Sequence, residues 1–299
     1  MNQSDLTADA ALKSADESFQ AKQYGEALDH YRRACELARQ EFNRPVEVEA
    51  LAQIARVSLI QGNKEDGLNW LKEASAKAVE TDPMGWSRYL SVKGRYEWKS
   101  QNLLDARQTF QDMYTFCANN NLAARAVDAA NMNAIVAESV DDQIEWCRRG
   151  IAIAESSDAD NWLGPLWNNL GATYYDTGKF EEALDCYLKA REYHWRFSDE
   201  RAKLVADYSI GMTYRMLNRF DEAMQWLRPS LAWAERLGDH SVIGQTAHDM
   251  AEVYIAQGKK SEGVTLLMQA RDSYRQAGYE SSAPDIWEQI NKRIAQAKK

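Results

Sequence analysis

The sequence has few turn-forming residues, no long apolar run and a deficit of positive charge. Glycine (15) and proline (5) make up about 7% of the 299 residues, against about 12% in average proteins, which leaves little room for the tight turns of an all-β protein. No stretch approaches the roughly 18 apolar residues of a membrane span. Lysine and arginine (36) are outnumbered by aspartate and glutamate (45). That balance argues against nucleic-acid and anionic-membrane binding.

Cysteine and targeting signals are equally sparse. The four cysteines lie at least 30 residues apart, at Cys35, Cys117, Cys147 and Cys186. None forms a Cys-x-x-Cys pair, so the sequence predicts neither a disulfide framework nor a zinc site. We expect reduced thiols packed as small apolar residues in helices. The N-terminus lacks the basic and apolar segments of a signal peptide. These features together predict a cytoplasmic protein.

No motif for catalysis, a cofactor or a metal stands out. Gly62 and Gly67 have P-loop spacing, but the lysine and hydroxyl residue that hold phosphate do not follow. No histidine lies in a His-x-x-x-His pattern; the four are His30, His194, His240 and His248. The sequence therefore predicts a protein that is not an enzyme and has no catalytic residues, cofactor or metal. An enzyme with an unrecognised site would need clustered titratable groups in a closed pocket.

What the sequence does have is a repeat. Its clearest copy runs from Trp167 to Ala190, and the same pattern of small and aromatic residues returns about 40 residues later. One slot marks every copy, and it is occupied in turn by Ala27, Gly67, Ala106, Gln143, Ala183, Ala223 and Gly263, at spacings of 40, 39, 37, 40, 40 and 40 residues. The copy around Gln143 is the weakest. Seven copies at a nearly fixed period indicate a repeat architecture.

Each copy reads as two helices. In the fifth copy, Leu170, Gly171 and Tyr174 share one face of a first helix, and Ala183 begins the buried face of a second. Gly178 between them is placed for a left-handed helix cap. Two helices cross closely only where one presents a small residue. Gly171 and Ala183 should therefore mark the contact.

These residues resemble the tetratricopeptide repeat, with its signature of small and aromatic residues, over roughly residues 10–275. The period is longer than the common one and is similar to that of kinesin light chains and Rap-type regulators. The resemblance implies an all-α fold, a right-handed α-α superhelix of about seven helical hairpins plus a C-terminal capping helix. Rap-type proteins carry an N-terminal helical bundle as an output module. Here the first repeat begins by about residue 11, and we expect no such module.

The domain plan follows from the repeat. We expect a polar N-terminal tail over residues 1–8, a single array of seven repeats over 9–280, and a capping helix with a basic tail over 284–299. Pro229 falls inside a second helix and should kink it or split it near Leu227. Tryptophan returns in register three residues after the small slot, at Trp70, Trp146 and Trp226. We expect these side chains to pack between neighbouring repeats.

The first helices carry a second stripe, which the resemblance places on a concave groove. The candidate partner-binding residues on and beside it are Arg56, Arg88, Arg95, Trp98, Lys99, Arg125, Asn168, Tyr175, Tyr208 and Arg215. Anions share the stripe, at Asp9, Asp16, Glu49, Asp128, Asp176 and Glu252. Arginine and tryptophan are enriched at binding hot spots. We therefore expect an acidic segment with an apolar anchor to dock near Arg88, Arg95, Trp98 and Lys99. A solvated helix face with scattered charge is the alternative for any single residue.

The leading functional hypothesis is a non-catalytic scaffold or adaptor that binds a peptide or helix of another protein in the groove. The alternative is a Rap-like peptide sensor that changes superhelical pitch on binding its ligand. The sequence does not identify the partner, the pathway or the oligomeric state.

Overall fold

The computed structural model describes residues 7–298. Residues 1–6 of the predicted tail, and Lys299, lie outside the described residues. Within 7–298 every regular element is a helix and no strand occurs. The predicted all-α class is confirmed.

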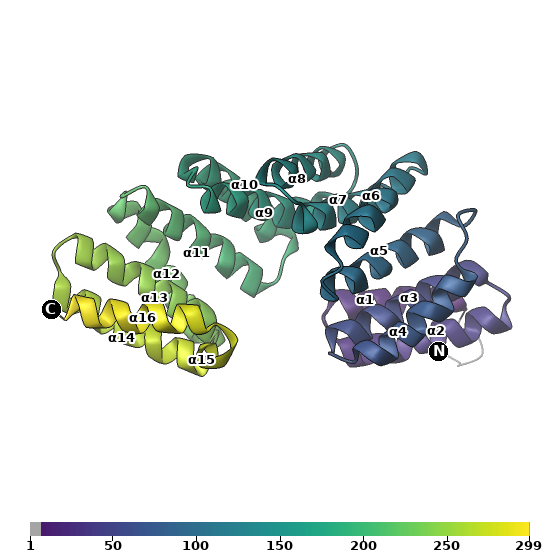
Figure 1. The fold of residues 1–299 in the computed structure, drawn as a ribbon, viewed down its shortest axis with the longest axis horizontal. Helices are drawn as coiled ribbons and strands as arrows, with labels where there is room; N and C mark the ends of the chain where they lie inside the picture. Colours follow the sequence, from purple (N-terminus) through teal and green to yellow (C-terminus); the bar gives the residue numbers. More distant parts are fainter. Residues whose placement is uncertain (1–6, 299) are drawn as a thin grey trace. The chain divides into compact units, whose positions relative to one another are not determined.

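The helices fall into two compact units, residues 1–157 and 158–299, each considered by itself (Figure 1). The N-terminal unit contains α1 (Ala8–Gln20), α2 (Tyr24–Gln40), α3 (Arg44–Ile60), α4 (Lys64–Lys77), α5 (Pro83–Lys99), α6 (Leu103–Asn119), α7 (Ala123–Val136) and α8 (Val140–Glu155). The C-terminal unit contains a 3-10 turn (Asp160–Trp162), α9 (Leu163–Asp176), α10 (Phe180–Phe197), α11 (Glu200–Met216), α12 (Phe220–Leu237), α13 (His240–Ala256), α14 (Lys260–Gln276), α15 (Tyr279–Ser282) and α16 (Pro284–Ala297). That residues 9–280 form one array stays a prediction.

Successive helices pack as seven antiparallel hairpins, from α1–α2 to α13–α14, as the repeat predicts. The small residues lie where the sequence placed them. A Cβ atom on Gly171 would come within 2.9 Å of the Tyr187 ring, and Ala183 is fully buried. A Cβ atom on Gly67 would collide with the Tyr96 hydroxyl. Close crossing of the helices therefore depends on these side chains being absent or small.

The turns between helices use the left-handed backbone region. Gly178 has φ +75°, which confirms the predicted cap. At five other turns a residue with a side chain takes this conformation, namely Lys22, Phe42, Gln101, Asn121 and Asn218. L-residues adopt it at an energetic cost.

Of the two alternatives expected for Pro229, a kink or a split near Leu227, the split is wrong. Pro229 does not split its helix, because α12 runs without interruption from Phe220 to Leu237. Proline lacks the N–H that would reach the carbonyl of Gln225. Burial of Leu227 and Ala234 on either side keeps both halves of α12 against the core.

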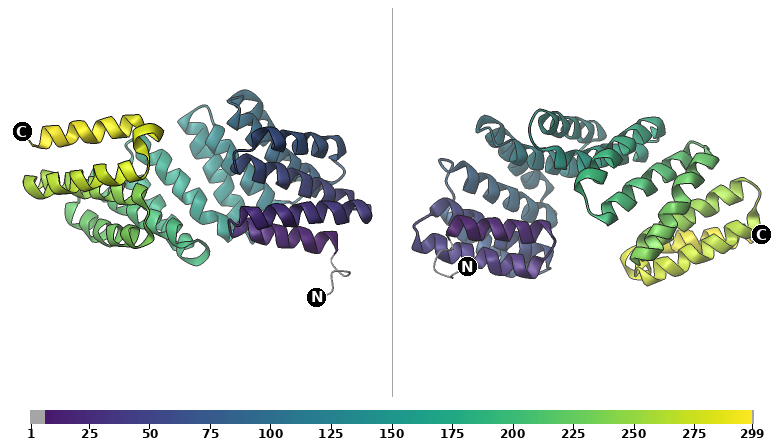
Figure 2. Two further views of the ribbon diagram at one scale, coloured as in Figure 1. Left: turned by 90° about the horizontal axis from the view of Figure 1, so that it is seen from below. Right: turned by 180° about the vertical axis from the view of Figure 1, so that it is seen from behind.

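The apolar residues behave as predicted. All four cysteines are buried within helices. Two of the three tryptophans in the repeated slot reach neighbouring hairpins: Trp146 packs edge-on against Tyr114 of α6, and Trp226 lies under Arg191 of α10. Trp70 packs in part against the apolar core of the N-terminal unit. Helix α16 lies along α14 (Figure 2) and buries Ile290 and Ile294. It closes the apolar side of the last hairpin.

Candidate functional site

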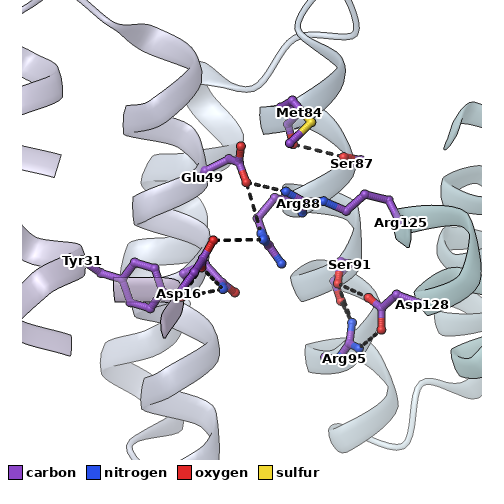
Figure 3. Close-up of polar contacts among 11 residues, drawn as sticks. Asp16, Tyr31, Glu49, Met84, Ser87, Arg88, Ser91, Arg95, Arg125 and Asp128 are labelled. Atoms are coloured by element: carbon purple, nitrogen blue, oxygen red, sulfur yellow. Dashed lines mark hydrogen bonds and ion pairs between the residues drawn. The ribbon is translucent and has the colours of Figure 1, made fainter. Parts of the chain in front are cut away.

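One face of the N-terminal unit gathers charged side chains from four helices. The helices are α1, α3, α5 and α7, the first helix of each hairpin, and α3 contacts α5 as α5 contacts α7. Residues three, four or seven apart along each helix project to the same side. The "arginine cluster" is the set Asp16, Glu49, Arg56, Arg88, Arg95, Arg125 and Asp128. Figure 3 shows most of it.

Glu49 holds two arginines from neighbouring hairpins. Its Oε2 accepts from Arg88 Nε of α5 at 3.4 Å and from Arg125 Nη2 of α7. Arg88 also faces the Asp16 carboxylate of α1, 4.0 Å away. The side chain of Glu49 is only 8% exposed, so its charge is balanced almost wholly within the protein. Glu49 therefore connects α3 with both α5 and α7.

Asp128 accepts the second group of hydrogen bonds in the arginine cluster. Its two oxygens accept from Arg95 Nη2 at 2.6 Å and from Ser91 Oγ at 3.0 Å. Burial would raise the pKa of Asp128, but Arg95 and then Arg56 outweigh it and hold the pKa well below its usual range. Asp128 is therefore ionised at neutral pH despite its burial.

Arg56 is the cation of the cluster with no carboxylate at ion-pair distance among residues 7–298. Its guanidinium lies over the Phe19 ring, 4.8 Å from the centroid. Burial and the nearby Arg95 lower the pKa of Arg56 to about 9, and the group stays charged at pH 7. The cluster thus has four arginines against three carboxylates, with Arg56 least well compensated.

A pocket of about 630 Å³ adjoins the cluster. Its lining combines apolar Leu12, Val46 and Met84 with two cations and four carboxylates, which are Lys13, Arg125, Asp9, Asp16, Glu17 and Glu49. The Nη1 atom of Arg125 is buried and has no hydrogen-bond partner. Burial lowers the pKa of Arg125 as well. The pocket therefore joins apolar surface to a donor that lacks an acceptor.

The C-terminal unit has a smaller counterpart around Asp249 of α13. Asp249 accepts from Arg215 Nε at 2.6 Å and from the Tyr208 hydroxyl at 2.8 Å. Burial and Asp249 raise the pKa of Tyr208. Burial and Asp249 also raise the pKa of Tyr175, whereas Arg215 lowers it. These predicted residues therefore share one acidic centre.

The structure does not join all the predicted residues. Lys99 lies over the Trp98 ring at 4.1 Å, and Trp98 packs in part against the core of α5–α7. Neither belongs to the arginine cluster. Asn168 is half-buried on α9 and belongs to neither charged centre. The predicted ten therefore separate into four clustered arginines, a Trp–Lys pair, the Asp249 group and Asn168.

Sequence reasoning missed the pairing within the face. It placed Arg88 and Arg95 as open cation sites, whereas both hold carboxylates of their own chain. It also missed Asp249. The signal was the spacing between partners: Arg88–Glu49, Arg95–Asp128 and Arg215–Asp249 lie 39, 33 and 34 residues apart, close to one repeat. Opposite charges near one period apart on first helices indicate a pair between neighbouring hairpins.

The described residues contain neither a cluster of metal ligands nor a helix that could cross a membrane. Nowhere in 7–298 do three or more His, Cys, Asp or Glu side chains gather as metal ligands would. Among the helices of that range, none has the length and apolar character needed to cross a bilayer.

Comparison with known proteins identifies the repeat. Residues 162–232 and 203–276 match the family described as tetratricopeptide repeat, a repeat rather than a catalytic domain. A search among curated proteins found no match to the sequence.

Three solved structures resemble this one. A signal transduction ATPase with numerous domains from Pyrococcus horikoshii, with a tetratricopeptide repeat sensor, is 14% identical over 96% of this chain and 44% of its own, with a TM-score of 0.74. The present chain thus spans less than half of that protein. The apo form of RapI is 14% identical over 90% of this chain and 77% of its own, with a TM-score of 0.73. A protein of Podosopora anserina with kinesin-light-chain, TPR-like repeats is 17% identical over 65% of this chain and 97% of its own, with a TM-score of 0.52. At such identities the likeness shows the fold, and it confirms the predicted resemblance to Rap and kinesin light chain arrays.

Proposed function

Since the chain is a tetratricopeptide repeat protein, we propose that it is a non-catalytic scaffold or adaptor. Tetratricopeptide repeats generally mediate binding to proteins. The partner segment, a peptide or a helix, lies on the first-helix face of the N-terminal unit. It carries an acidic residue and an apolar anchor.

The observation that carries this proposal is the charge of Arg56, which Asp128 balances only from beyond ion-pair distance. A buried cation that lacks a direct ion pair is costly, and a carboxylate from a partner would relieve that cost while forming a strong, charge-assisted hydrogen bond. Leu12, Val46 and Met84 offer apolar surface within the pocket on the same face. Arg125 Nη1 offers a further donor. A segment with a carboxylate beside an apolar side chain matches both features.

The test removes the charge of Arg56 and leaves the Arg88–Glu49 and Arg95–Asp128 ion pairs intact. Reversal of Arg88 or Arg95 is uninformative, because either change would unpair Glu49 or Asp128 and destabilise the unit. Arg56→Gln gives up the contact with Phe19 and the longer-range attraction to Asp128, but it breaks no ion pair of the cluster. Arg149→Gln is the matched control, since Arg149 is an exposed cation of α8 that also lies over an aromatic ring.

Affinity capture with the full chain and both variants, followed by quantitative mass spectrometry, provides the measurement. Partners of the face should be lost about tenfold or more with Arg56→Gln, since a charge-assisted hydrogen bond contributes roughly 1.5–3 kcal/mol. They should be retained with Arg149→Gln, and circular dichroism should show equal helicity. Equal capture by all three proteins would contradict the proposal.

The peptide-sensor function remains a second proposal, supported by the ion pairs between hairpins. Arg88–Glu49 and Arg95–Asp128 each join first helices of different hairpins. A ligand carboxylate that competes for these arginines would change the helix spacing. Small-angle scattering with the captured partner's peptide separates the functions, because a scaffold keeps its radius of gyration and a sensor compacts. The four buried thiols suit a reducing compartment, and we propose the cytoplasm.

A further inference from the structure

The turn between α2 and α3 carries an aromatic ring that the fold does not need. Phe42 has φ +56°, a region that is costly for a bulky L-residue. Its side chain is 93% exposed. Within residues 7–298, the other left-handed turn positions contain no aromatic residue; they are Lys22, Gly62, Gln101, Asn121, Gly178, Asn218, Gly238, Gly258 and Gly278. Glycine or asparagine at position 42 would relieve the backbone strain and would also remove the exposed apolar ring.

The turn that presents Phe42 is held firmly. The Asn43 amide donates to the Ala38 carbonyl at 2.8 Å, closing the end of α2. Arg44 Nε donates to the carbonyl of Lys77 at the end of α4, at 2.7 Å. A platform fixed in this way loses little conformational freedom when it binds. The backbone that carries the ring is therefore already fixed in place.

A positively charged pocket of about 420 Å³ lies beside the ring, lined by Ala38, Arg39, Phe42, Arg44, Glu47 and Lys77. Arg39 and Lys77 bind Glu47 at 2.8 and 3.2 Å, and Arg39 also binds Glu73. Arg44 is exposed, and its hydrogen bond goes to a carbonyl rather than a carboxylate. Three cations thus face two carboxylates, with the excess charge at Arg44.

We propose that Phe42 and Arg44 form a docking site for a partner segment that presents an aromatic side chain flanked by carboxylates. The partner ring packs on Phe42 and removes it from water. A carboxylate beside that ring accepts from the Arg44 guanidinium and balances the excess charge of the pocket. The site is separate from the arginine cluster, because none of its lining residues belongs to that cluster.

The first experiment observes the ring directly. The full chain is labelled with 4-fluorophenylalanine, which gives one ¹⁹F signal for each of its seven phenylalanines, and Phe42→Asn assigns the signal of Phe42. The probe is the capped pentapeptide Asp-Glu-Phe-Glu-Asp, compared with Asn-Gln-Phe-Gln-Asn and Lys-Lys-Phe-Lys-Lys. The acidic probe should shift the Phe42 signal to saturation. It should bind at least about fivefold tighter than the neutral probe and weaken as salt is raised from about 50 to about 300 mM.

Two variants locate the binding. Arg44→Gln should bring the acidic probe to the affinity of the neutral one, whereas Arg56→Gln should leave the response of Phe42 unchanged even if the proposed function fails. Equal binding of all three probes, no shift of Phe42, or a Phe42 shift that follows protein concentration alone would overturn the proposal. The last result would indicate self-association.

A second measurement separates docking from folding. Phe42→Asn should raise the melting temperature by about 2 °C or more, since it relieves the backbone and removes exposed apolar surface, while it abolishes probe binding measured by calorimetry. Gln101→Asn makes the same replacement at a turn with φ +65° and should leave probe binding intact. A lower melting temperature for Phe42→Asn would show that the ring serves the fold and would overturn the proposal.

Discussion

Removal of the Asp128 carboxylate should destabilise the N-terminal unit strongly. Asp128 and Arg95 are 9% and 12% exposed, and their atoms lie 2.6 Å apart. At an effective dielectric constant of about 20, charges roughly 4 Å apart attract by about 4 kcal/mol. Breaking a buried pair by removing one partner typically costs about 3–5 kcal/mol. We expect Asp128→Asn to lose that much, because it strands Arg95 and leaves Arg56 without a nearby countercharge.

The stranded charge, rather than the lost bond, causes most of this effect. The double variant Arg95→Met with Asp128→Leu should therefore lose only about 1–2 kcal/mol, since apolar replacement of a buried pair is often close to neutral and only Arg56 stays uncompensated. Glu145→Gln, in an exposed pair with Arg149, should change stability by less than about 0.5 kcal/mol.

Hydrogen exchange measured by mass spectrometry resolves the effect by helix. Peptides from α5 and α7 should exchange faster in Asp128→Asn, whereas peptides from α12–α14 serve as the internal reference. Urea unfolding followed by circular dichroism gives the corresponding free energies. Asp128→Asn with less than about 1 kcal/mol of loss, or a double variant as unstable as the single one, would refute the buried-charge reasoning.

Three further changes test the packing and the electrostatics. Gly171→Ala should lower the free energy of urea unfolding by about 1–3 kcal/mol, because the added Cβ meets the Tyr187 ring. Gly25→Ala, whose Cβ meets nothing within 4 Å, should be neutral or raise it by up to about 1 kcal/mol. Similar losses at both sites would contradict the crossing geometry. Pro229→Ala should stabilise α12 by about 1–3 kcal/mol, since it restores a backbone N–H within a continuous helix, and calorimetry would show no gain if the proline were needed. Asp128 has a folded pKa below its unfolded value of about 3.9, so its stabilisation is present above that pH and is lost as the pH falls below it. In acid, the free energy of unfolding should therefore fall less steeply with pH for Asp128→Asn than for the wild type. Equal slopes would refute the assignment.

Much of the fold was predictable because the repeat period can be read directly from the sequence, without knowledge of long-range contacts. Six small residues and Gln143 at nearly equal spacing predict seven hairpins, and Gly178 predicts a left-handed turn in its place. The split at Pro229 was wrong because backbone propensity is a weak prior. Burial on both sides of the proline, at Leu227 and Ala234, outweighs one missing hydrogen bond.

The charged face was predictable as a face but not as a set of contacts. Helical periodicity places Arg88 and Arg95 on one stripe. Which carboxylate each meets depends on how far neighbouring helices slide along their axes, and the sequence states this only through partners near one repeat apart. The strained, exposed Phe42 was missed for a related reason, since the apolar pattern gives no backbone angle.

The most direct test of the central claim is methyl NMR of the nine methionines in the full chain, titrated with a capped acidic peptide that contains a single leucine. Met84 lines the pocket of the first-helix face, whereas Met268 is an exposed methionine of α14. Binding on that face predicts a saturable shift of the Met84 signal that Arg56→Gln weakens, with Met268 unmoved. A shift of Met268 with Met84 unchanged would contradict it, as would a Met84 response that Arg56→Gln does not alter.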